Sequence, residues 1–409
     1  MSRTTWRFVI MSVALLVTVA VALPAGAQQF SDVFFNALQN NCSQLGGFSG
    51  DPSDTPPFTS GPGGPYGPNL ASLCRNQGQV TSATGSLSVD TRGIGAEEQL
   101  LRRLRERRDG TAASADGPAG LRGLGVFASG DYQTFDKDVT RFEPGYTRDT
   151  WGGTIGADYS WSGKGIIGLA FSYAYQDGTF DSKGGTFDTH VYGPTLYGSV
   201  LVVPNLFIDL FAGYTRRDYT IDRRYSFFRP GVANIAGATA HGETHGDEFR
   251  VGTNAGYDFT IGPVTVGPRF GINFRENHIH DYAEGGRPVT GLELAYDDQY
   301  QTSLTSNLGA FASMAISAGF GVFVPQVSFE WVHEFLNNQR AIYFHFVEDL
   351  GQRRFRFQND PPDRDYFNAG VGLVLVLPNG LSPYVNVSQF FGYSKQSSTT
   401  VTAGLRFSF

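Results

Sequence analysis

The side chains with the greatest potential for chemistry in this chain are histidines that lie close to acidic residues. With their neighbours they form three groups: His278-Ile279-His280-Asp281, His241-x-x-x-His245 and Asp297-Asp298. A metal site needs three or four ligands that converge, and the sequence places neither a cysteine nor a regularly spaced set of carboxylates beside these histidines. We therefore expect solvated loop histidines here, with no metal site and no cofactor.

The same residues could in principle form the acid–base pair of a hydrolase. Asp297 and Asp298 could be drawn beside His278 or His280 in that role. Such spacings are common by chance in polar loops, however, and no local signature marks a nucleophile. We expect no enzymatic activity.

A basic cluster, Arg353-Arg354-Phe355-Arg356, occupies another expected loop. Arginine pairs well with phosphate, so this cluster could contact lipopolysaccharide, although an ordinary exposed group of charges is the simpler interpretation. The formal net charge of the chain is -7, which gives no indication of nucleic-acid binding.

The N-terminus has the layout of a secretory signal peptide. Arg3 and Arg7 precede an apolar run over residues 8–23, and the small residues Ala25-Gly26-Ala27 follow. We predict that residues 1–27 are removed by cleavage after Ala27. An uncleaved anchor helix is the alternative, but the apolar run is short for a full membrane span.

The two cysteines of the chain, Cys42 and Cys74, are predicted to form a disulfide. In an exported protein such a pair more often forms a disulfide than a metal site. Two free thiols are the alternative interpretation.

The composition after the signal peptide indicates a particular class of exported protein. Charged residues make up 17% of the chain and glycine 52 of 409 residues, whereas soluble domains have about 25% charged residues and about 7% glycine. Aromatic residues are frequent at 14%, and no later segment has the roughly 20 apolar residues that a membrane helix requires. This combination favours a transmembrane β-barrel.

From about residue 123 the chain is a series of segments in which apolar and small or polar residues alternate. Alternation with a period of two is typical of a strand, because successive side chains point to opposite faces. In the last segment Val401, Leu405 and Phe407 share one face, while Gly404 and Arg406 share the other. We predict twelve strands, near residues 123–136, 146–161, 165–176, 188–203, 205–221, 246–262, 263–278, 298–318, 320–334, 365–377, 381–393 and 397–409.

The connections between these segments alternate in length. Short turns of Gly, Pro, Ser and Asn alternate with long polar loops, which we predict near residues 137–145, 177–187, 222–245, 279–297 and 335–364. This alternation is typical of an outer-membrane barrel with tight periplasmic turns and longer outside loops. An even number of strands then places the end of the twelfth strand on the periplasmic side.

The twelfth strand must pair with the first, because a lipid-exposed backbone has to satisfy all its polar groups internally. The apolar face then points toward lipid and the small, polar face toward the lumen. Aromatic residues near strand ends, such as Tyr159 and Trp161 beside a short turn and Tyr173 and Tyr175 beside a long loop, should form the interfacial girdles. The predicted lumen-lining residues are Asp158, Arg250, Asp258, Arg269, Arg275 and Arg406.

Residues 28–122 differ from the rest of the chain. Residues 30–45 could form a short helix, and residues 46–68 are rich in Gly, Pro and Ser, which favours an irregular segment. Residues 95–109 are predicted to be a helix, with glutamates early and arginines late as the helix dipole favours. We expect this basic helix in the lumen, matched to acidic groups such as Asp158 and Asp258; a soluble periplasmic helix is the alternative.

The chain from about residue 95 to residue 409 resembles the translocator domain of autotransporters. The segments that carry the resemblance are Ile155-Gly156-Ala157-Asp158-Tyr159, residues 167–173, residues 207–214 and the closing Leu405-x-Phe407-x-Phe409. The resemblance implies a twelve-stranded barrel in the bacterial outer membrane, with the helix before the first strand threading the pore. It also implies that the barrel-assembly machinery recognises the last strand through Leu405, Phe407 and Phe409, and that the barrel takes part in exporting an upstream passenger.

The chain departs from that family at its N-terminus, where residues 28–94 are all that remains as a passenger. A disulfide between Cys42 and Cys74 would also be awkward to pass through a narrow pore. We therefore expect residues 28–94 to stay periplasmic or plug the lumen, with a vestigial export role. Residues 95–122 would be a linker helix and connection, and residues 123–409 the barrel.

The expected function is that of a translocator-type barrel which anchors or exports this short segment. A passive pore or structural barrel gated by the N-terminus is the alternative. The expected partners are outer-membrane lipid, lipopolysaccharide and the barrel-assembly machinery, and we expect a monomer.

Overall fold

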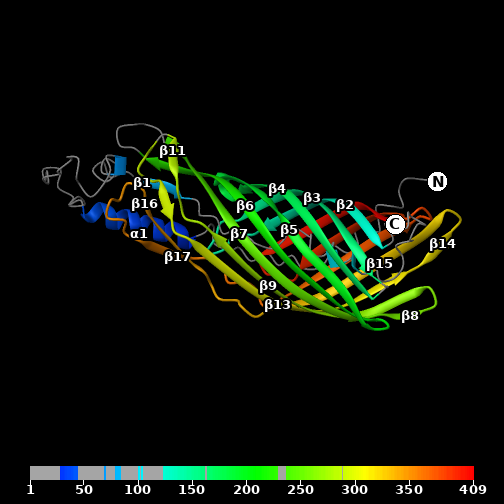
Figure 1. Cartoon of the computed structure of the whole chain (residues 1–409). Coiled ribbons are helices and arrows are strands. Elements are labelled where there is room, and N and C mark those ends of the chain that lie inside the picture. The colour runs from blue at the N-terminus through cyan, green and yellow to red at the C-terminus, as the bar shows by residue number, and fades with distance from the viewer. Residues whose placement is uncertain are drawn as a thin grey trace, which may run out of the picture.

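The computed structural model describes residues 28–44, 69–70, 79–83, 100–101, 103–104, 123–161, 164–228, 236–287 and 289–409. They form a closed antiparallel barrel of twelve strands with a smaller lobe at one end (Figure 1). The predicted signal peptide 1–27 and most of residues 46–94 lie outside the described residues. Among the residues that are described, no helix has both the length and the apolar character needed to cross a membrane.

All twelve predicted barrel strands are present, and most begin and end within a few residues of the prediction. The barrel strands are β2 (Leu124–Lys137), β3 (Tyr146–Trp161), β4 (Gly165–Phe180), β5 (Gly185–Val203), β6 (Leu206–Phe228), β7 (Ala236–Tyr257), β9 (Val264–Ile279), β13 (Gln299–Met314), β15 (Gly321–Glu334), β18 (Asp365–Val376), β19 (Leu381–Phe391) and β20 (Gln396–Ser408). The predicted closure is confirmed, because β20 pairs with β2 from Gly125↔Ser408 to Lys137↔Gln396.

The two ends of the barrel differ in their connections. At one end, which we call the short-turn end, the strands join through brief segments such as 162–164, 204–205 and 377–380; two small strands, β8 (Phe259–Ile261) and β14 (Ile316–Ala318), extend hairpins there. At the other, the long-loop end, several connections are longer. The connection at 181–184, which contains a 3-10 turn, η1 (Asp181–Lys183), is short, so the long loop predicted at 177–187 is mostly strand. The first residue of β2 and the last of β20 both lie at the short-turn end.

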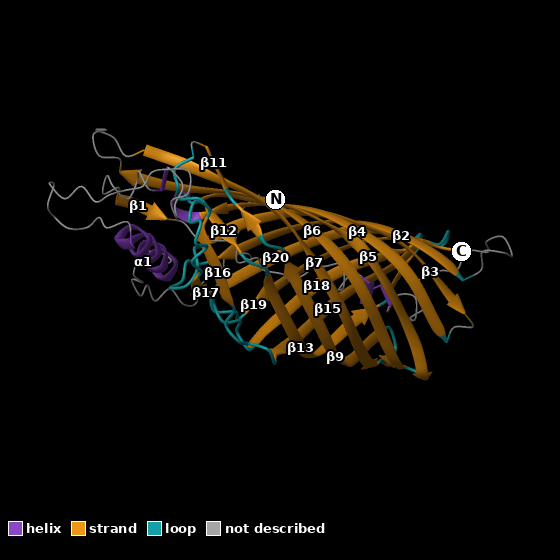
Figure 2. Cartoon of the chain, turned by 60° about the vertical axis from the view of Figure 1, so that its left-hand side comes forward, coloured by secondary structure: helices purple, strands orange, loops and turns teal. Residues whose placement is uncertain are grey.

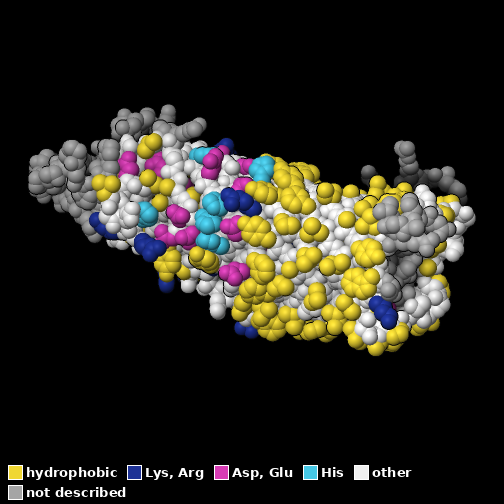
Figure 3. All heavy atoms as spheres, viewed as in Figure 1, with side chains coloured by type: hydrophobic (Ala, Val, Ile, Leu, Met, Phe, Trp, Pro, Cys, Tyr) yellow, Lys and Arg dark blue, Asp and Glu magenta, His cyan; other side chains and the backbone are white. Residues whose placement is uncertain are grey.

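The barrel is apolar outside and polar inside, as predicted. In the same stretch of β3, Ile155 is 63% exposed whereas the neighbouring inward Thr154 is 2% exposed. On β20, Leu405 is 55% exposed and Arg406 is 2% exposed. Apolar side chains cover the middle and short-turn part of the outer surface as a broad band (Figure 3). This band is the surface that hydrocarbon would cover.

Aromatic side chains border this band at the long-loop end. Their polar atoms are tied to acidic groups on the next strand: Tyr132 to Asp149, Tyr192 to Asp218, Tyr214 to Asp247, and Trp331 to Asp365. A ring with an apolar body and a hydrogen-bonded tip suits the boundary between lipid and water. The carboxylates mark the level at which the outer surface becomes wet.

Beyond that level, three of the predicted long polar loops are folded into strands. β6 and β7 continue past the barrel as a hairpin whose far end carries β11 (Gly285–Arg287). A separate sheet has the order β10-β12-β16-β17. Its strands are β10 (Tyr282–Ala283), β12 (Leu294–Tyr296), β16 (Ala341–Phe346) and β17 (Phe355–Gln358). We call these strands and the outer part of the β6–β7 hairpin the lobe.

The prediction that residues 222–245, 279–297 and 335–364 are long polar loops is therefore wrong where these residues form strands. The lobe has its own apolar core, in which Leu292, Leu294, Ile342, Phe344 and Phe346 are completely buried. These side chains pack against one another rather than against lipid, so the alternation in β16 is that of a water-soluble sheet. Residues 123–409 thus hold a barrel and a second, soluble core.

The N-terminal helix α1 (Gln28–Gln44) completes the lobe. Its buried residues Phe34, Ala37, Leu38 and Cys42 recur at helical spacing and so form one face. That face packs against the lobe, where the Phe34 and Phe346 rings lie 5.5 Å apart, and α1 lies beside β16 and β17 in both views (Figures 1 and 2). A short strand, β1 (Gln79–Ala83), pairs with β6 at Gln79↔Phe228.

These contacts bear on the expectation that residues 28–94 stay periplasmic or plug the lumen, which stays a prediction. Every described part of that segment lies at the long-loop end, opposite the end where β2 begins and β20 finishes. The apolar surface of the lobe decides this placement, because it buries the apolar face of α1.

Candidate functional site

Residues 100, 101, 103 and 104 lie inside the barrel. Leu100 and Leu104, four positions apart, are buried against the wall at Phe127, Ile166 and Tyr197. The four described residues are helical, so the helix predicted near 95–109 is present at its centre and lies in the lumen. Arg103 contacts the same side of the wall, with its guanidinium 5.8 Å from the centre of the Phe127 ring.

Arg103 fixes the helix to the wall by a buried ion pair. Its Nε lies 2.7 Å from Asp158 Oδ2 and its Nη2 lies 3.3 Å from Asp158 Oδ1. The Tyr197 hydroxyl donates to the same carboxylate at 3.2 Å. Asp158 is thus held by two donors, which is the arrangement a buried carboxylate needs.

Glycines on the inner wall make room for the rings that contact the helix. A Cβ at Gly156 would lie 2.4 Å from the Phe127 ring, and one at Gly168 would lie 2.3 Å from the Tyr197 ring. The rings can therefore lie flat along the wall and leave the lumen wide enough for a helix.

A second set of charges lies nearer the long-loop end of the lumen. Glu248 is completely buried, and its carboxylate lies 2.9 Å from Arg217, 3.8 Å from Arg250 and 4.0 Å from Arg275. One carboxylate shared by three guanidinium groups leaves this layer of the lumen positively charged. The sequence analysis missed Glu248 and Arg217, although the alternation of residues 246–262 places Glu248 on the same face as Arg250.

The remaining predicted lumen residues also lie on the inner face. Arg406 is buried with its guanidinium 3.7 Å over the Tyr384 ring. Asp258 forms an ion pair with Arg269 of the wall. Among the described residues of the lumen helix, Arg103 provides the expected match, and its partner is Asp158.

The helix leaves part of the lumen open. A cavity of about 290 Å³ lies beside Leu101 and is lined by inward side chains that include Gln133, Asp209, Asn254, Asn307 and Ser388. A smaller cavity of about 140 Å³ lies nearer the long-loop end, where Lys137 meets Glu143 at 3.0 Å and Asp360 at 2.5 Å. Asp360 belongs to the connection between β17 and β18, which therefore reaches into the mouth of the barrel.

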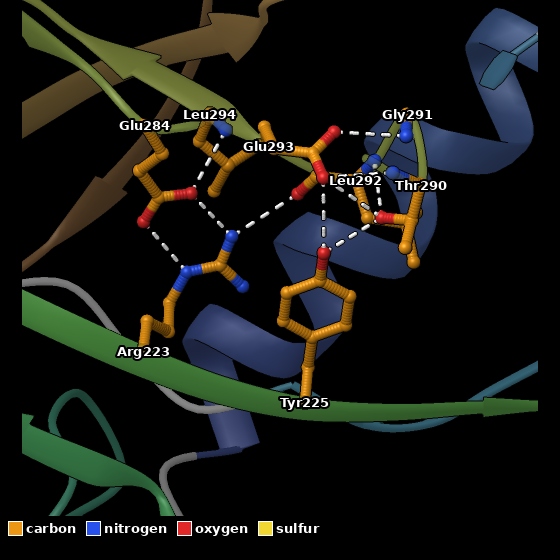
Figure 4. Close-up of polar contacts among 8 residues, drawn as sticks. All are labelled: Arg223, Tyr225, Glu284, Thr290, Gly291, Leu292, Glu293 and Leu294. Carbon is orange, nitrogen blue, oxygen red and sulfur yellow. Dashed lines mark hydrogen bonds and ion pairs between the residues drawn. The ribbon is translucent and has the colours of Figure 1, made fainter. Parts of the chain in front are cut away.

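In the lobe, a network of buried ion pairs and hydrogen bonds orders the loop that contacts the N-terminal segment (Figure 4). Arg223 on β6 binds both oxygens of Glu284, at 2.8 Å and 2.5 Å, and donates to the Leu292 carbonyl at 3.0 Å. Glu284 also accepts from the Leu294 amide at 2.9 Å. Burial disfavours the charged form of Arg223, but Glu284 more than offsets it and raises the pKa of the guanidinium. The pair thus fixes residues 284–294 to β6.

Glu293 orders the tip of this loop. Its carboxylate accepts from the amides of Thr290 and Gly291, both at 2.8 Å, and from the Tyr225 hydroxyl at 3.2 Å. Gly291 has a φ of +84°, and a Cβ there would lie 2.4 Å from the Leu70 amide nitrogen. The loop backbone thereby comes into direct contact with Leu70.

Glu348 holds the same part of the N-terminal segment from the other side. Its carboxylate accepts from the Asn69 side chain at 2.7 Å and from the Leu70 amide at 2.6 Å, and Leu70 is completely buried. Further along the lobe, Arg353 donates to the Asn41 side chain of α1 at 3.3 Å. The docking of the segment therefore combines apolar burial with specific polar contacts.

This assigns the basic cluster Arg353-Arg354-Phe355-Arg356 to the lobe. Arg353 contacts α1, Arg354 pairs with Asp297, and the Phe355 ring lies 5.8 Å from the Phe344 ring. Arg353 and Phe355 are half-buried, whereas Arg354 and Arg356 are exposed, as expected for an exposed group of charges. Cys42 is buried beside them and forms a disulfide; Cys74 lies outside the described residues, so the Cys42–Cys74 pairing stays a prediction.

The predicted histidine groups lie at the outer rim of the barrel, and carboxylates accompany them. His278 Nε2 lies 2.9 Å from Asp298, His280 Nε2 lies 3.1 Å from Asp247, and His241 Nδ1 lies 2.8 Å from Asp222. The sequence predicted solvated loop histidines and offered Asp298 as a possible partner of His278 or His280, whereas it did not point to Asp247 or Asp222. The pairs arise from the register between β6, β7, β9 and β13, which the sequence alone does not reveal.

Comparison with protein families decides what this barrel is. The family model described as the autotransporter beta-domain matches residues 126–388, which is more than half of the chain. The chain belongs to that family. Its members are outer-membrane barrels of type V secretion and serve in transport rather than as enzymes.

Solved structures agree with this fold. The translocator domain of the autotransporter NalP from Neisseria meningitidis is similar at a TM-score of 0.57 and 14% identity, over 76% of this chain and 96% of that one. The β-domain of the Bordetella autotransporter BrkA is similar at a TM-score of 0.51 and 17% identity, over 70% of this chain and 100% of that one. A search of curated protein sequences finds no match.

Proposed function

We propose that this autotransporter exports residues 28–94 through its own barrel and keeps them docked on the lobe at the cell surface. The observation that carries the proposal is the order of the described segments along the barrel axis. Residues 28–44, 69–70 and 79–83 contact the lobe, residues 100, 101, 103 and 104 lie in the lumen, and residue 123 lies at the short-turn end. A chain that visits these places in this order passes through the barrel.

The family supports the direction of this passage. Autotransporter barrels lie in the bacterial outer membrane, and in such barrels the longer loops face outside. The long-loop end and its lobe then face outside, and residues 28–94 form a passenger that is small, surface-displayed and not released. The apolar core of the lobe buries one face of α1, and Glu348 binds Asn69 and Leu70. These contacts favour retention of the passenger over its release.

Two further parts of the proposal concern assembly. Leu405 on β20 is exposed, and the rings of Phe407 and Phe409 lie 4.7 Å apart. These three apolar side chains are suited to recognition by the barrel-assembly machinery. The closed β2–β20 seam leaves the barrel complete within one chain, which supports a monomer. Lipopolysaccharide would surround the lobe base as part of the outer leaflet.

An epitope inserted after Ser60 tests the surface location. Antibody should bind intact cells that carry this insertion, because the segment around residue 60 joins two parts docked on the lobe. The matched control is the same epitope inserted after Asn379, in the short turn between β18 and β19, which should bind antibody only after permeabilisation. Binding at Ser60 that also requires permeabilisation would reject export.

A passive pore gated by the N-terminus is the second candidate. The open volume of about 290 Å³ beside the lumen helix favours it. It predicts ion conduction by the full chain, whereas a retained passenger predicts a lumen that conducts poorly until the helix is removed.

A further inference from the structure

We propose that the outer rim of the barrel holds a site for a borderline divalent transition-metal ion of the zinc type, with His278, His280 and Asp298 as the protein ligands. The site is independent of the export function proposed above. It lies on the outer surface, at the border between the apolar band and the wet base of the lobe, where histidine, acidic and basic side chains gather (Figure 3).

Strand register brings the three ligands together. His278 and His280 are two positions apart, so both side chains leave the same, outward face of the β9 segment. Tyr300 pairs with His278, and Gln299 pairs with Ile279. The same register, extended by one residue, places Asp298 opposite His280. Side chains opposite each other on neighbouring strands lie about 4.5–5.5 Å apart at Cβ, which is close enough to share one ion.

The ligand atoms already converge. His278 Nε2 lies 2.9 Å from Asp298 Oδ1, and His280 Nδ1 lies 4.0 Å from the same oxygen. One ligand atom from each of the three residues lies within 4.8 Å of the ligand atoms of the other two. Because bonds to zinc are about 2.0–2.2 Å long, two ligands of one ion lie roughly 3–4 Å apart. Small side-chain rotations would close the difference.

The neighbours hold these ligands in the required form. His280 Nε2 lies 3.1 Å from Asp247 Oδ2, and a proton donated there leaves the Nδ1 lone pair free to face Asp298 and the ion. A carboxylate behind a histidine ligand is the usual second contact of a zinc site. The Tyr214 hydroxyl holds Asp247 in turn, and the His278 ring stacks on Tyr300 at 4.2 Å.

The chemistry of the set selects the class of ion. Two imidazoles and one carboxylate suit Zn²⁺, Ni²⁺ or Cu²⁺, whereas Mg²⁺ and Ca²⁺ prefer oxygen ligands alone. The side chains are 25%, 31% and 47% exposed, so an ion can enter from solvent and water can complete its coordination. Bound there, the ion would tie β9 to the segment before β13 at the base of the lobe.

Other histidine–carboxylate pairs at the rim provide a natural control. His333 Nδ1 lies 2.9 Å from Asp365 Oδ1, and His333 is 25% exposed at its side chain, as His278 is. Among the described residues, His278, His280 and Asp298 form the only group in which three such ligand atoms lie this close together. The His333–Asp365 pair should therefore bind zinc far more weakly.

The test is calorimetric titration of the detergent-solubilised full chain, free of any histidine tag, with Zn²⁺. We expect one ion per chain, and a thermal midpoint that rises with zinc concentration because the ion binds the folded state. The double variant His278→Ala/His280→Ala should lose this binding, and His333→Ala should keep it. Asp247→Asn, which removes no ligand, should weaken binding by about 10–100-fold.

Heat-modifiable gel mobility without metal checks that each variant is folded. Unchanged zinc binding in the double variant would overturn the proposal, as would an equal loss in His333→Ala, which would mean adventitious binding to rim histidines. Displacement of zinc by Mg²⁺ or Ca²⁺ at the same concentration would also overturn it, since it would identify an oxygen-only site.

Discussion

The barrel wall and the lobe use the same alternating strand pattern for opposite solvents. On β9 of the wall, Phe270 is 48% exposed and the adjacent Arg269 is 5% exposed. On β16 of the lobe, Phe344 is completely buried and the adjacent Tyr343 is 39% exposed. Alternation therefore identifies a strand, but the surrounding medium decides which face is buried.

Strand β6 contains both situations. Within the barrel its inward side chains include the polar residues Asp209 and Arg217, which face the lumen. Where the strand leaves the barrel, the same face carries Ile221 and Tyr225, which are buried in the lobe. The change from a wet lumen to a dry core along one face is what allows the lobe to bind α1.

Replacing one phenylalanine in each region should separate the two media most strongly. Phe344→Ala should destabilise the lobe by about 3–5 kcal/mol, because it opens a cavity in a packed core. Phe270→Ala should cost much less, because mobile lipid fills the space on the outer face. Urea unfolding in detergent micelles, followed by tryptophan fluorescence and by proteolysis of the lobe, compares them. Equal costs would mean that the two faces meet the same environment.

A charge placed on either face of β7 tests the inside-out wall. Ala255→Arg points outward between Ile208 and Phe270 and should cost about 2–4 kcal/mol at mid-depth in the membrane. Asn254→Arg points into the lumen beside the open cavity and should be tolerated. Heat-modifiable gel mobility of membrane fractions reports insertion. Loss of insertion in Asn254→Arg alone would reverse the face assignment.

The sequence predicted the wall well because each barrel strand is long and alternates on its own. It missed the lobe because β10 and β12 have only two and three residues. β10 pairs with β12, and β12 pairs with β16, which is distant in the sequence. It missed Glu248 because the alternation places it on the face of Arg250 but does not show that it pairs with Arg217 on the neighbouring strand. The acidic partners of His278 and His280 depend on inter-strand register, which periodicity within one strand does not define.

The polar contacts of Glu348 should hold the N-terminal segment less strongly than the burial of the apolar face of α1 does. Glu348→Ala removes the acceptor for Asn69 and the buried Leu70 amide and should cost about 1–3 kcal/mol of docking free energy. Protease added to intact cells should then cleave the segment faster while the barrel stays folded. Glu243→Ala, which removes a carboxylate that is 74% exposed at its side chain, is the matched control and should leave cleavage unchanged.

The smallest expected effect is a pH dependence in the β6–β7 hairpin. The hydrogen bond with Asp222 raises the pKa of His241 above its ordinary value of 6.5. Its stabilisation is therefore fully present below pH 6.5 and is lost as the pH rises through the folded-state pKa. Because the pair is exposed, it should contribute about 0.2–1 kcal/mol at most. Thermal midpoints of His241→Gln and the parent chain should differ at pH 5.5 and converge by pH 8.5; a constant difference would exclude the ion pair as its cause.

The passage of the chain through its own barrel is tested most directly by single-channel conductance in planar bilayers. The full chain should conduct poorly, because the helix that carries Leu100, Arg103 and Leu104 lies in the lumen, against the wall around Asp158. Deletion of residues 28–110, with the signal peptide retained, should give a large rise in conductance. Equal conductance before and after the deletion would contradict the account.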